Sequence, residues 1–128
     1  MQIRKTIGQI GEDIACLYLE DKKYRILARN MRIPAGELDV LARDPKGVLV
    51  FVEVKALAGV GEAFLPEQHF DQEKQWRVRR LAQNIANRYP HYIDEKLGYR
   101  IDLVAISIKD PLEKDWRKAC IINHYENF

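Results

Sequence analysis

Charged side chains stand at every second position in two short segments of this chain. The first segment carries Glu37 and Asp39, and the second carries Glu53 and Lys55. Because side chains alternate between the two faces of a β-strand, each pair would share one face of its strand. Carboxylate oxygens are preferred ligands of Mg²⁺ and Mn²⁺, and a neighbouring amine could orient a water or neutralise charge on a phosphoryl oxygen. The pattern indicates a candidate metal-assisted catalytic centre.

A tight turn between the two segments sets the expected strand register. Pro45 supplies the fixed backbone angle of a type I turn, and Gly47 suits the left-handed position of a three-residue hairpin loop. With that loop, Asp44 pairs with Val48. The even-numbered valines from Val48 to Val54 then share one face of their strand and should belong to a core.

Counting outward from the turn places Asp39 opposite Glu53 and Glu37 opposite Lys55. Opposed side chains have Cβ atoms about 4.5–5.5 Å apart, so two carboxylates would face each other across the hairpin. Such a pair is destabilising unless a cation lies between the carboxylates, and Mg²⁺ or Mn²⁺ is the natural candidate. The alternative is an ordinary half-exposed hairpin, because charged and apolar residues alternate in any such hairpin and Glu-x-Lys is common.

Five segments of the chain resemble the PD-(D/E)xK nuclease superfamily and, more closely, the YraN-like bacterial proteins, which are related to archaeal Holliday-junction resolvases. The chain departs from the family's usual pattern at Leu57, where a basic residue is usual, and at its Glu126-Asn127-Phe128 ending, where Asn-Ala-Phe is usual. The matching segments are residues 8–15 (GQIGEDIA), 24–30 (YRILARN), 36–39 (GELD), 50–55 (VFVEVK) and 100–102 (RID), and Lys74 also fits.

The resemblance implies a restriction-endonuclease-like fold and a metal-dependent endonuclease that hydrolyses DNA phosphodiester bonds, including those of branched or junction DNA. It implies that Asp39 and Glu53 bind Mg²⁺ or Mn²⁺ and that Lys55 serves the catalytic water. Glu12 would add an accessory acidic group to the metal site; its alternative is an exposed helix acid. Glu37 is a further candidate catalytic residue because it shares a face with Asp39. The alternative function is a nuclease-like fold that binds nucleic acid or protein without catalysis.

Basic residues gather in two regions outside the acidic segments. Arg29 and Arg32 lie in an early strand region, and Lys74 and Arg77 lie in a later helix. We expect these four side chains to contact DNA, because cations that hold the phosphate backbone supply much of the affinity for nucleic acid. The formal net charge is only +2, so the alternative for the helix is a solvated basic face.

Hydrophobic periodicity and turn residues predict a single domain over residues 1–128 with the element order α-β-β-β-α-β-β. This order is typical of an α/β fold in which helices flank a mixed β-sheet. The predicted helices cover residues 6–22 and 71–88, and the predicted strands cover residues 24–32, 37–43, 48–55, 100–108 and 118–123.

Two further expectations concern the surroundings of the acidic segments. Glu12 should lie nearly opposite the apolar stripe of the first helix, which would pack on the sheet. Glycines and a proline in residues 56–66 predict a loop beside the acidic site that could close over a substrate. The expected stripe consists of Ile7, Ile10, Ile14, Leu17 and Tyr18.

The remaining sequence features are less informative about function. The 128-residue chain has no run of about 18 apolar residues and no basic-then-apolar leader, so we expect a cytoplasmic protein without a membrane partner. Cys16 and Cys120 are expected to be buried free thiols. Arg100 and Asp102 should form a structural ion pair. Trp76 and Trp116 could stack on bases, but Trp76 has no clear aromatic platform around it, so packing or an interface is favoured for it. Because related resolvases act on two-fold symmetric junctions, a homodimer is expected.

Overall fold

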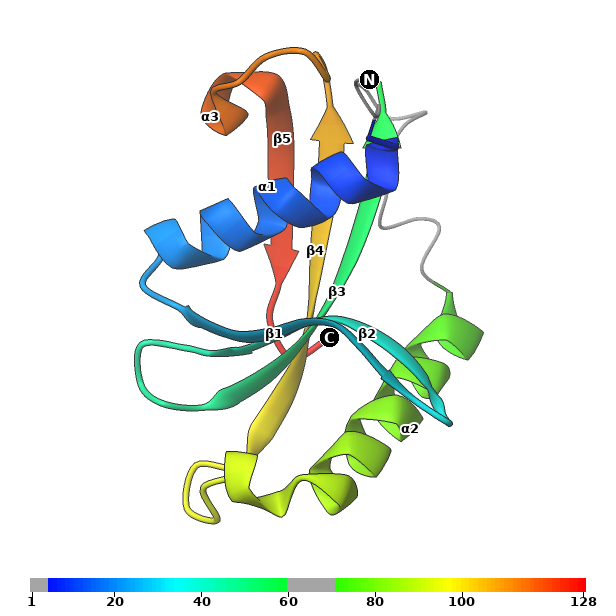
Figure 1. Cartoon of the computed structure of the whole chain (residues 1–128), viewed down its shortest axis with the longest axis vertical. Coiled ribbons are helices and arrows are strands. Elements are labelled where there is room, and N and C mark those ends of the chain that lie inside the picture. Colours follow the sequence, from blue (N-terminus) through cyan, green and yellow to red (C-terminus); the bar gives the residue numbers. More distant parts are fainter. Residues whose placement is uncertain (1–4, 60–70) are drawn as a thin grey trace.

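In the part of the chain that the structure describes, five strands form one mixed β-sheet in the order β1-β2-β3-β4-β5 (Figure 1). The computed structural model describes residues 5–59 and 71–128. Neighbouring strands are antiparallel except β3 and β4, which are parallel and therefore need the crossover that contains α2. The strands are β1 (Arg25–Ile33), β2 (Gly36–Arg43), β3 (Leu49–Ala58), β4 (Tyr99–Ile108) and β5 (Cys120–Tyr125). The two longer helices are α1 (Ile7–Asp21) and α2 (Gln72–Arg88).

This element order confirms the predicted α/β fold with a mixed sheet flanked by helices. Two short elements, the 3₁₀ helix η3 (Pro90–Tyr92) and α3 (Trp116–Ala119), are not predicted by the sequence pattern. The predicted loop at residues 56–66 begins later than expected, because β3 keeps pairing with β4 as far as Ala58 and Ile108. From residue 60 onward that predicted loop lies outside the described residues.

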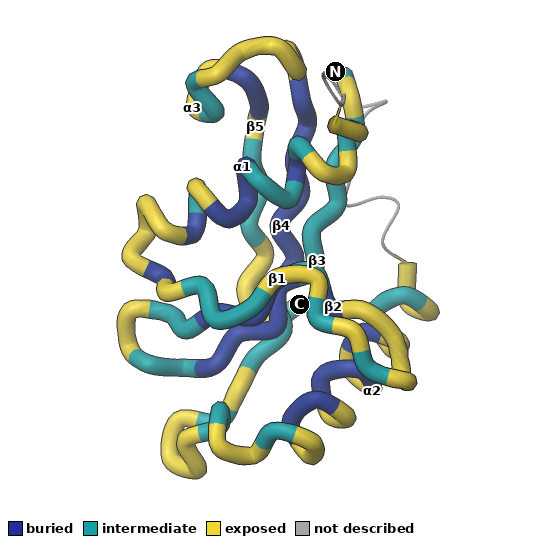
Figure 2. The backbone as a smooth tube through the Cα atoms, in the orientation of Figure 1, coloured by how far each residue is buried: buried dark blue, intermediate teal, exposed yellow. Residues whose placement is uncertain are grey.

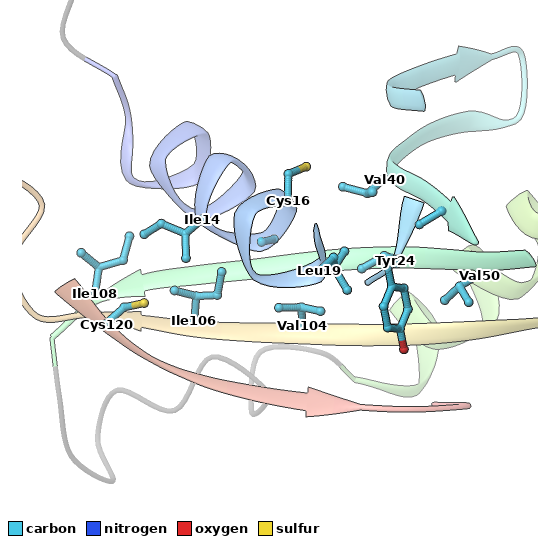
Figure 3. Close-up of a cluster of buried hydrophobic side chains, with 13 residues drawn as sticks. Ile14, Cys16, Leu19, Tyr24, Val40, Val50, Val104, Ile106, Ile108 and Cys120 are labelled. Atoms are coloured by element: carbon cyan, nitrogen blue, oxygen red, sulfur yellow. The ribbon is translucent and has the colours of Figure 1, made fainter. Parts of the chain in front are cut away.

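The helix α1 packs on one face of the sheet, which is the face formed by even-numbered residues of β3 and β4 (Figure 3). A capping box fixes where the helix begins: the Thr6 hydroxyl accepts a hydrogen bond from the Gln9 amide, and the Gln9 side chain accepts one from the Thr6 amide. The buried cluster beneath the helix includes Ile14, Leu19, Tyr24, Val50, Val52, Val104 and Ile106.

Four residues of the predicted stripe of α1, Ile7, Ile10, Ile14 and Tyr18, pack on the core as expected, but the buried side extends around the helix to Gly11 and Leu19 and excludes Leu17. Leu17 is 49% exposed, whereas Gly11 and Leu19 are buried. Gly11 explains the difference, because a Cβ atom at this position would overlap the Cβ atom of Ala56 on β3. The missing side chain lets the helix lie directly against the strand. Glu12 therefore flanks the buried side and is half-buried, where the sequence pattern places it opposite the stripe.

The helix α2 covers the other face of the sheet, and its buried residues alternate with exposed ones along its length (Figure 2). The carboxylate of Asp71 caps the helix by accepting a hydrogen bond from the Lys74 amide. Leu81 and Ile85 then pack against the odd-numbered side of the sheet, where Phe51 is fully buried. The even and odd residues of β3 thus serve two separate cores.

A buried ionic network connects β4 with β5. Asp102 is fully buried and accepts hydrogen bonds from Arg100 Nε at 3.0 Å, His124 Nε2 at 2.8 Å and the Asn127 amide at 3.0 Å. This confirms the predicted ion pair between Arg100 and Asp102. Although burial opposes ionisation, the hydrogen bonds from His124 and Arg100 lower the pKa of Asp102 below its usual value. The buried carboxylate is therefore stabilised as an anion.

Two other expectations can be compared with the described part of the chain. Cys16 and Cys120 are buried and free, as predicted. Among the described residues, no helix has both the length and the apolar character needed to cross a membrane.

We predict that Gly11→Ala lowers the free energy of unfolding by about 1–3 kcal/mol, because the added methyl group overpacks the contact with Ala56. The matched control is Gly8→Ala on the exposed side of the same helix, where the nearest atom to a new Cβ is the Thr6 hydroxyl at 3.8 Å. At this position the better helix propensity of alanine should raise the free energy of unfolding by up to about 1 kcal/mol. Urea unfolding measures both values, and equal effects would contradict the packing of α1 described above.

Candidate functional site

The candidate site lies where β2 separates from β3. The predicted register is confirmed from the turn, where the Asp44 amide donates to the Val48 carbonyl at 3.0 Å, up to the pair of Val40 with Val52. Beyond that pair the backbone ladder ends. The Asp39 carboxylate instead accepts a hydrogen bond from the Val54 amide at 2.8 Å. A side chain therefore replaces the next backbone partner, and the two strands diverge.

This divergence corrects part of the expected pairing. Neither expected pair, Asp39 with Glu53 or Glu37 with Lys55, is part of the ladder, because β2 leaves β3 beyond the pair of Val40 with Val52. Glu37 pairs with Arg32 of β1 instead. Their side chains also form an ion pair, with Arg32 Nε 3.1 Å from Glu37 Oε2. Glu37 still lines the same hollow as Asp39, but its carboxylate is held by an arginine on the hairpin.

Three carboxyl groups from three elements influence one another at the divergence. Burial and the charge of Asp39 raise the pKa of Glu53 to about 8. Burial also raises the pKa of Asp39, although the hydrogen bond from Val54 opposes that rise. Glu12 of α1 has a raised pKa for the same two reasons, burial and the charge of Asp39. The structure thus brings Glu12, Asp39 and Glu53 together into one electrostatically strained cluster.

Basic side chains face this cluster across a hollow of about 410 Å³. Lys55 projects from the same face of β3 as Glu53 and makes no ion pair with the described residues. Lys74 and Arg77 reach the hollow from α2. Arg77 is close enough for its charge to oppose the rise in the pKa of Glu53. An anionic group in the hollow would meet cations from two elements.

The other two predicted DNA contacts lie outside this hollow. Arg29 is bound to Asp13, with Arg29 Nη2 2.8 Å from Asp13 Oδ1, and Arg32 is bound to Glu37 as described above. Arg29, Asp13 and Glu12 line a neighbouring hollow. Each ion pair engages one guanidinium nitrogen and offsets part of the positive charge that a phosphate would meet, while other N–H groups of the same arginine could still contact it.

Sequence reasoning missed Asn30, which lies in β1 beside the cluster. Its backbone is left-handed, with φ of 50°, in the middle of a strand. Its side chain hydrogen-bonds to Glu12 and so opposes the rise in the pKa of that carboxyl. Asparagine tolerates the left-handed region better than most residues, so an asparagine inside a predicted strand was the available signal.

The carboxylates of the cluster suit a divalent cation. This conclusion rests on a structural observation and not on the family resemblance. Glu53 Oε2 is buried and has no hydrogen-bond partner among the described residues, although buried carboxylate oxygens are normally satisfied. Within the described ranges, no group of three or more His, Cys, Asp or Glu side chains is arranged to hold a metal ion by itself. Mg²⁺, however, commonly takes one or two carboxylates and keeps several waters. Asp39 and Glu53 supply such a pair.

Fold and site together define an α/β protein whose mixed sheet carries an acidic cluster between two diverging strands. Residues 11–106 match the family described as "Uncharacterised protein family UPF0102", and the chain belongs to this family. A UPF0102 protein of Desulforamulus reducens is 38% identical over 104 residues, which cover 80% of this chain and 82% of the relative. A UPF0102 protein of Alkaliphilus oremlandii is 35% identical over 127 residues, or 98% of both chains. The resemblance to the YraN-like proteins is thereby confirmed.

A solved structure described as "Structure of EndoMS-dsDNA2 complex" overlaps with 92% of this chain and 42% of the other chain. The sequence identity is 18% and the TM-score is 0.38. A likeness this loose assigns no activity.

We predict that Glu53→Gln stabilises the protein at pH 8 much more than at pH 5. Between the usual value of 4.5 and about 8, the folded protein keeps a proton on Glu53 that the unfolded chain has lost. The free energy of unfolding therefore falls as pH rises through this window, by on the order of a few kcal/mol. A glutamine side chain does not ionise, so the variant avoids this fall in the free energy of unfolding. Its amide group can also donate a hydrogen bond to Asp39.

Urea unfolding in EDTA at several pH values measures this difference. The matched control is Glu37→Gln, whose carboxylate is partly exposed and paired with Arg32. It should change the free energy of unfolding by less than about 0.5 kcal/mol at either pH. If Glu53→Gln changed the free energy of unfolding equally at pH 5 and pH 8, the raised pKa of Glu53 would be contradicted.

Proposed function

We propose that the protein is a metal-dependent endonuclease that hydrolyses DNA phosphodiester bonds. One observation carries the proposal: the unpartnered oxygen of Glu53 lies beside Asp39, in a hollow that Lys55, Lys74 and Arg77 also line. Carboxylates that repel each other suit a divalent cation, and the basic side chains suit the phosphate that such a cation would activate. If these carboxyl groups had only a structural role, their unfavourable contribution to the free energy of folding would have no explanation.

Asp39 and Glu53 are the residues that would hold Mg²⁺ or Mn²⁺, with Glu12 at the margin of the site. The cation, when bound, would neutralise charge on the scissile phosphate and on the leaving oxygen. Asp39 has a second role that needs no cation, because its bond to the Val54 amide keeps the strands apart. Glu12 has a raised pKa, so it is a better proton acceptor near neutral pH than an ordinary glutamate.

Lys55 is the candidate for stabilising charge in the transition state. It follows Glu53 by two residues on the same strand face, which is a spacing of about 6.6 Å along the strand. An ammonium at this position would donate a hydrogen bond to a non-bridging phosphate oxygen or orient the attacking water. Because Lys55 makes no ion pair with the described residues, it needs no exchange of partner before it acts.

Lys74 and Arg77 would hold the DNA backbone near the cluster. Arg29 and Arg32 would join them through guanidinium N–H groups that their ion pairs with Asp13 and Glu37 do not engage. The finer parts of the proposal, a branched or junction substrate and a homodimer, are supported by the resemblance to junction resolvases. Light scattering at micromolar concentration tests the dimer, and cleavage of a panel of duplex, flap and four-way substrates tests the substrate class.

We predict that Asp39→Asn abolishes Mn²⁺ binding measured by isothermal titration. The asparagine oxygen can still accept the Val54 hydrogen bond, so the variant should fold, yet it lacks the charge that attracts the cation. Glu37→Gln is the control, because its carboxylate is engaged by Arg32, and it should bind Mn²⁺ nearly as the wild type does. Undiminished binding by Asp39→Asn would remove the proposed ligand pair.

We predict that Lys55→Ala lowers the single-turnover cleavage rate by about 10²–10³. DNA affinity should change little, because many backbone contacts share the binding energy. Lys46→Ala, at an exposed turn position, is the control for loss of one positive charge and should cleave normally. Normal cleavage by Lys55→Ala would reject its catalytic role. A wild type that binds every substrate and cleaves none would favour the non-catalytic binding module.

A further inference from the structure

Trp76 is the most exposed aromatic side chain in the part of the chain that the structure describes. Its side chain lies on α2, and the residue is 60% exposed. Of the two expected roles of Trp76, packing is therefore wrong for the described residues, whereas a role in an interface is untested. A single exposed hydrophobic side chain is common on protein surfaces, so a functional argument must rest on the charged groups around Trp76.

The second tryptophan shows what a packed ring looks like in this protein. Trp116 is half-buried against Tyr18, with the ring centroids 6.3 Å apart in an edge-to-face arrangement. Both tryptophans have an arginine over the ring: Arg117 lies 4.4 Å from the Trp116 centroid, and Arg80 lies 5.3 Å from the Trp76 centroid. The two pairs share their chemistry but differ in exposure, and they lie at different ends of the molecule, on α3 and α2 (Figure 1).

The Trp76–Arg80 pair lies on the same helix as Lys74 and Arg77, which line the candidate site. Arg77 lines the hollow beside Glu53 and directly follows Trp76 in the sequence. At about 100° per residue, Arg80 lies about 60° around the helix from Arg77, and Trp76 about 40° farther. A strand of nucleic acid held at Lys74 and Arg77 would therefore continue onto the exposed ring.

The chemistry of this surface suits an unpaired nucleobase. Bases of single-stranded DNA stack on exposed aromatic rings between cations that hold the backbone. In the pair, Arg80 lies over the ring of Trp76, and the large exposed fraction leaves ring surface for a base. Bases inside an intact duplex are already stacked on their neighbours, so they cannot use such a ring without unpairing.

We propose that Trp76 and Arg80 form a stacking platform for an unpaired base next to the cleavage site, so that the preferred substrate carries a single-stranded segment. This inference rests on the proposed nuclease function. A second copy of this chain is the less favoured occupant, because an isologous contact would bring the same basic face with Arg77 and Arg80 against itself.

Binding without metal tests the platform separately from catalysis. The probes are a fluorescein-labelled oligothymidylate and a blunt duplex of the same length, both titrated in EDTA and followed by anisotropy. Trp76→Ala should bind the single strand about 5- to 100-fold more weakly and the duplex as the wild type does. Trp116→Phe is the matched control, because it alters the other tryptophan–arginine pair, and it should bind both probes normally.

Fluorescence gives an independent readout. In the Trp116→Phe background, Trp76 is the only tryptophan of the chain, so its emission should be quenched by unlabelled oligothymidylate and not by the duplex. Unchanged single-strand affinity of Trp76→Ala, or absence of quenching, would overturn the platform. A Trp76→Ala variant that becomes monomeric while keeping wild-type affinity for the single strand would overturn it in favour of a dimer contact.

The platform and the nuclease function can fail separately. If quenching and the affinity loss occur but no substrate is cleaved with Mg²⁺ or Mn²⁺, the platform stands and the nuclease function falls. If the wild type cleaves and Trp76→Ala binds the single strand normally, the platform falls and the nuclease function stands.

Discussion

The hydrogen bond from the Val54 amide to Asp39 determines the rest of the site. Without it, the hairpin of β2 and β3 would continue its backbone pairing and bring Glu37 opposite Lys55. With it, one carboxylate replaces a backbone partner and the strands separate beside a hollow that α2 also lines. Glu12 of α1 lies close enough to Asp39 to be affected by its charge. The separation lets Glu12 approach from one side while Lys74 and Arg77 approach from the other. The Asp39 side chain thus ends the pairing of the hairpin and opens the candidate site between its strands.

The cluster that results is costly for folding. The pKa of each of the three carboxyl groups is raised, that of Glu53 to about 8, so the fold disfavours their ionised forms. One buried oxygen of Glu53 also has no hydrogen-bond partner among the described residues. The surrounding cores offset this cost. Even residues of β3 pack beneath α1, odd residues pack beneath α2, and Gly11 lets α1 approach closely. Strain of this kind is common where binding or catalysis needs groups that repel one another in the empty state.

Sequence patterns predicted the sheet, the turn and the identity of the acidic residues, because alternation and turn chemistry are local properties. They placed Asp39 and Glu53 close together by counting from the turn, and the register holds as far as Val40 and Val52. Patterns could not show that a side chain would end the ladder, nor that Gly11 would extend the buried side of α1, because both depend on contacts between distant segments. The engagement of Arg29 by Asp13 and the exposure of Trp76 are tertiary effects of the same kind.

The hydrogen-bond network around Asp102 makes the stability of the sheet depend on the last segment of the chain. Asp102 is fully buried in β4, but two of its three hydrogen-bond partners, His124 and Asn127, come from β5 and the residues after it. If β5 were detached, Asp102 would lose His124 and Asn127, keep Arg100, and become open to water along the uncovered edge of β4. The docking of β5 thus both buries this carboxylate and supplies the hydrogen bonds that offset its burial, so residues 120–127 stabilise the sheet through one side chain of β4.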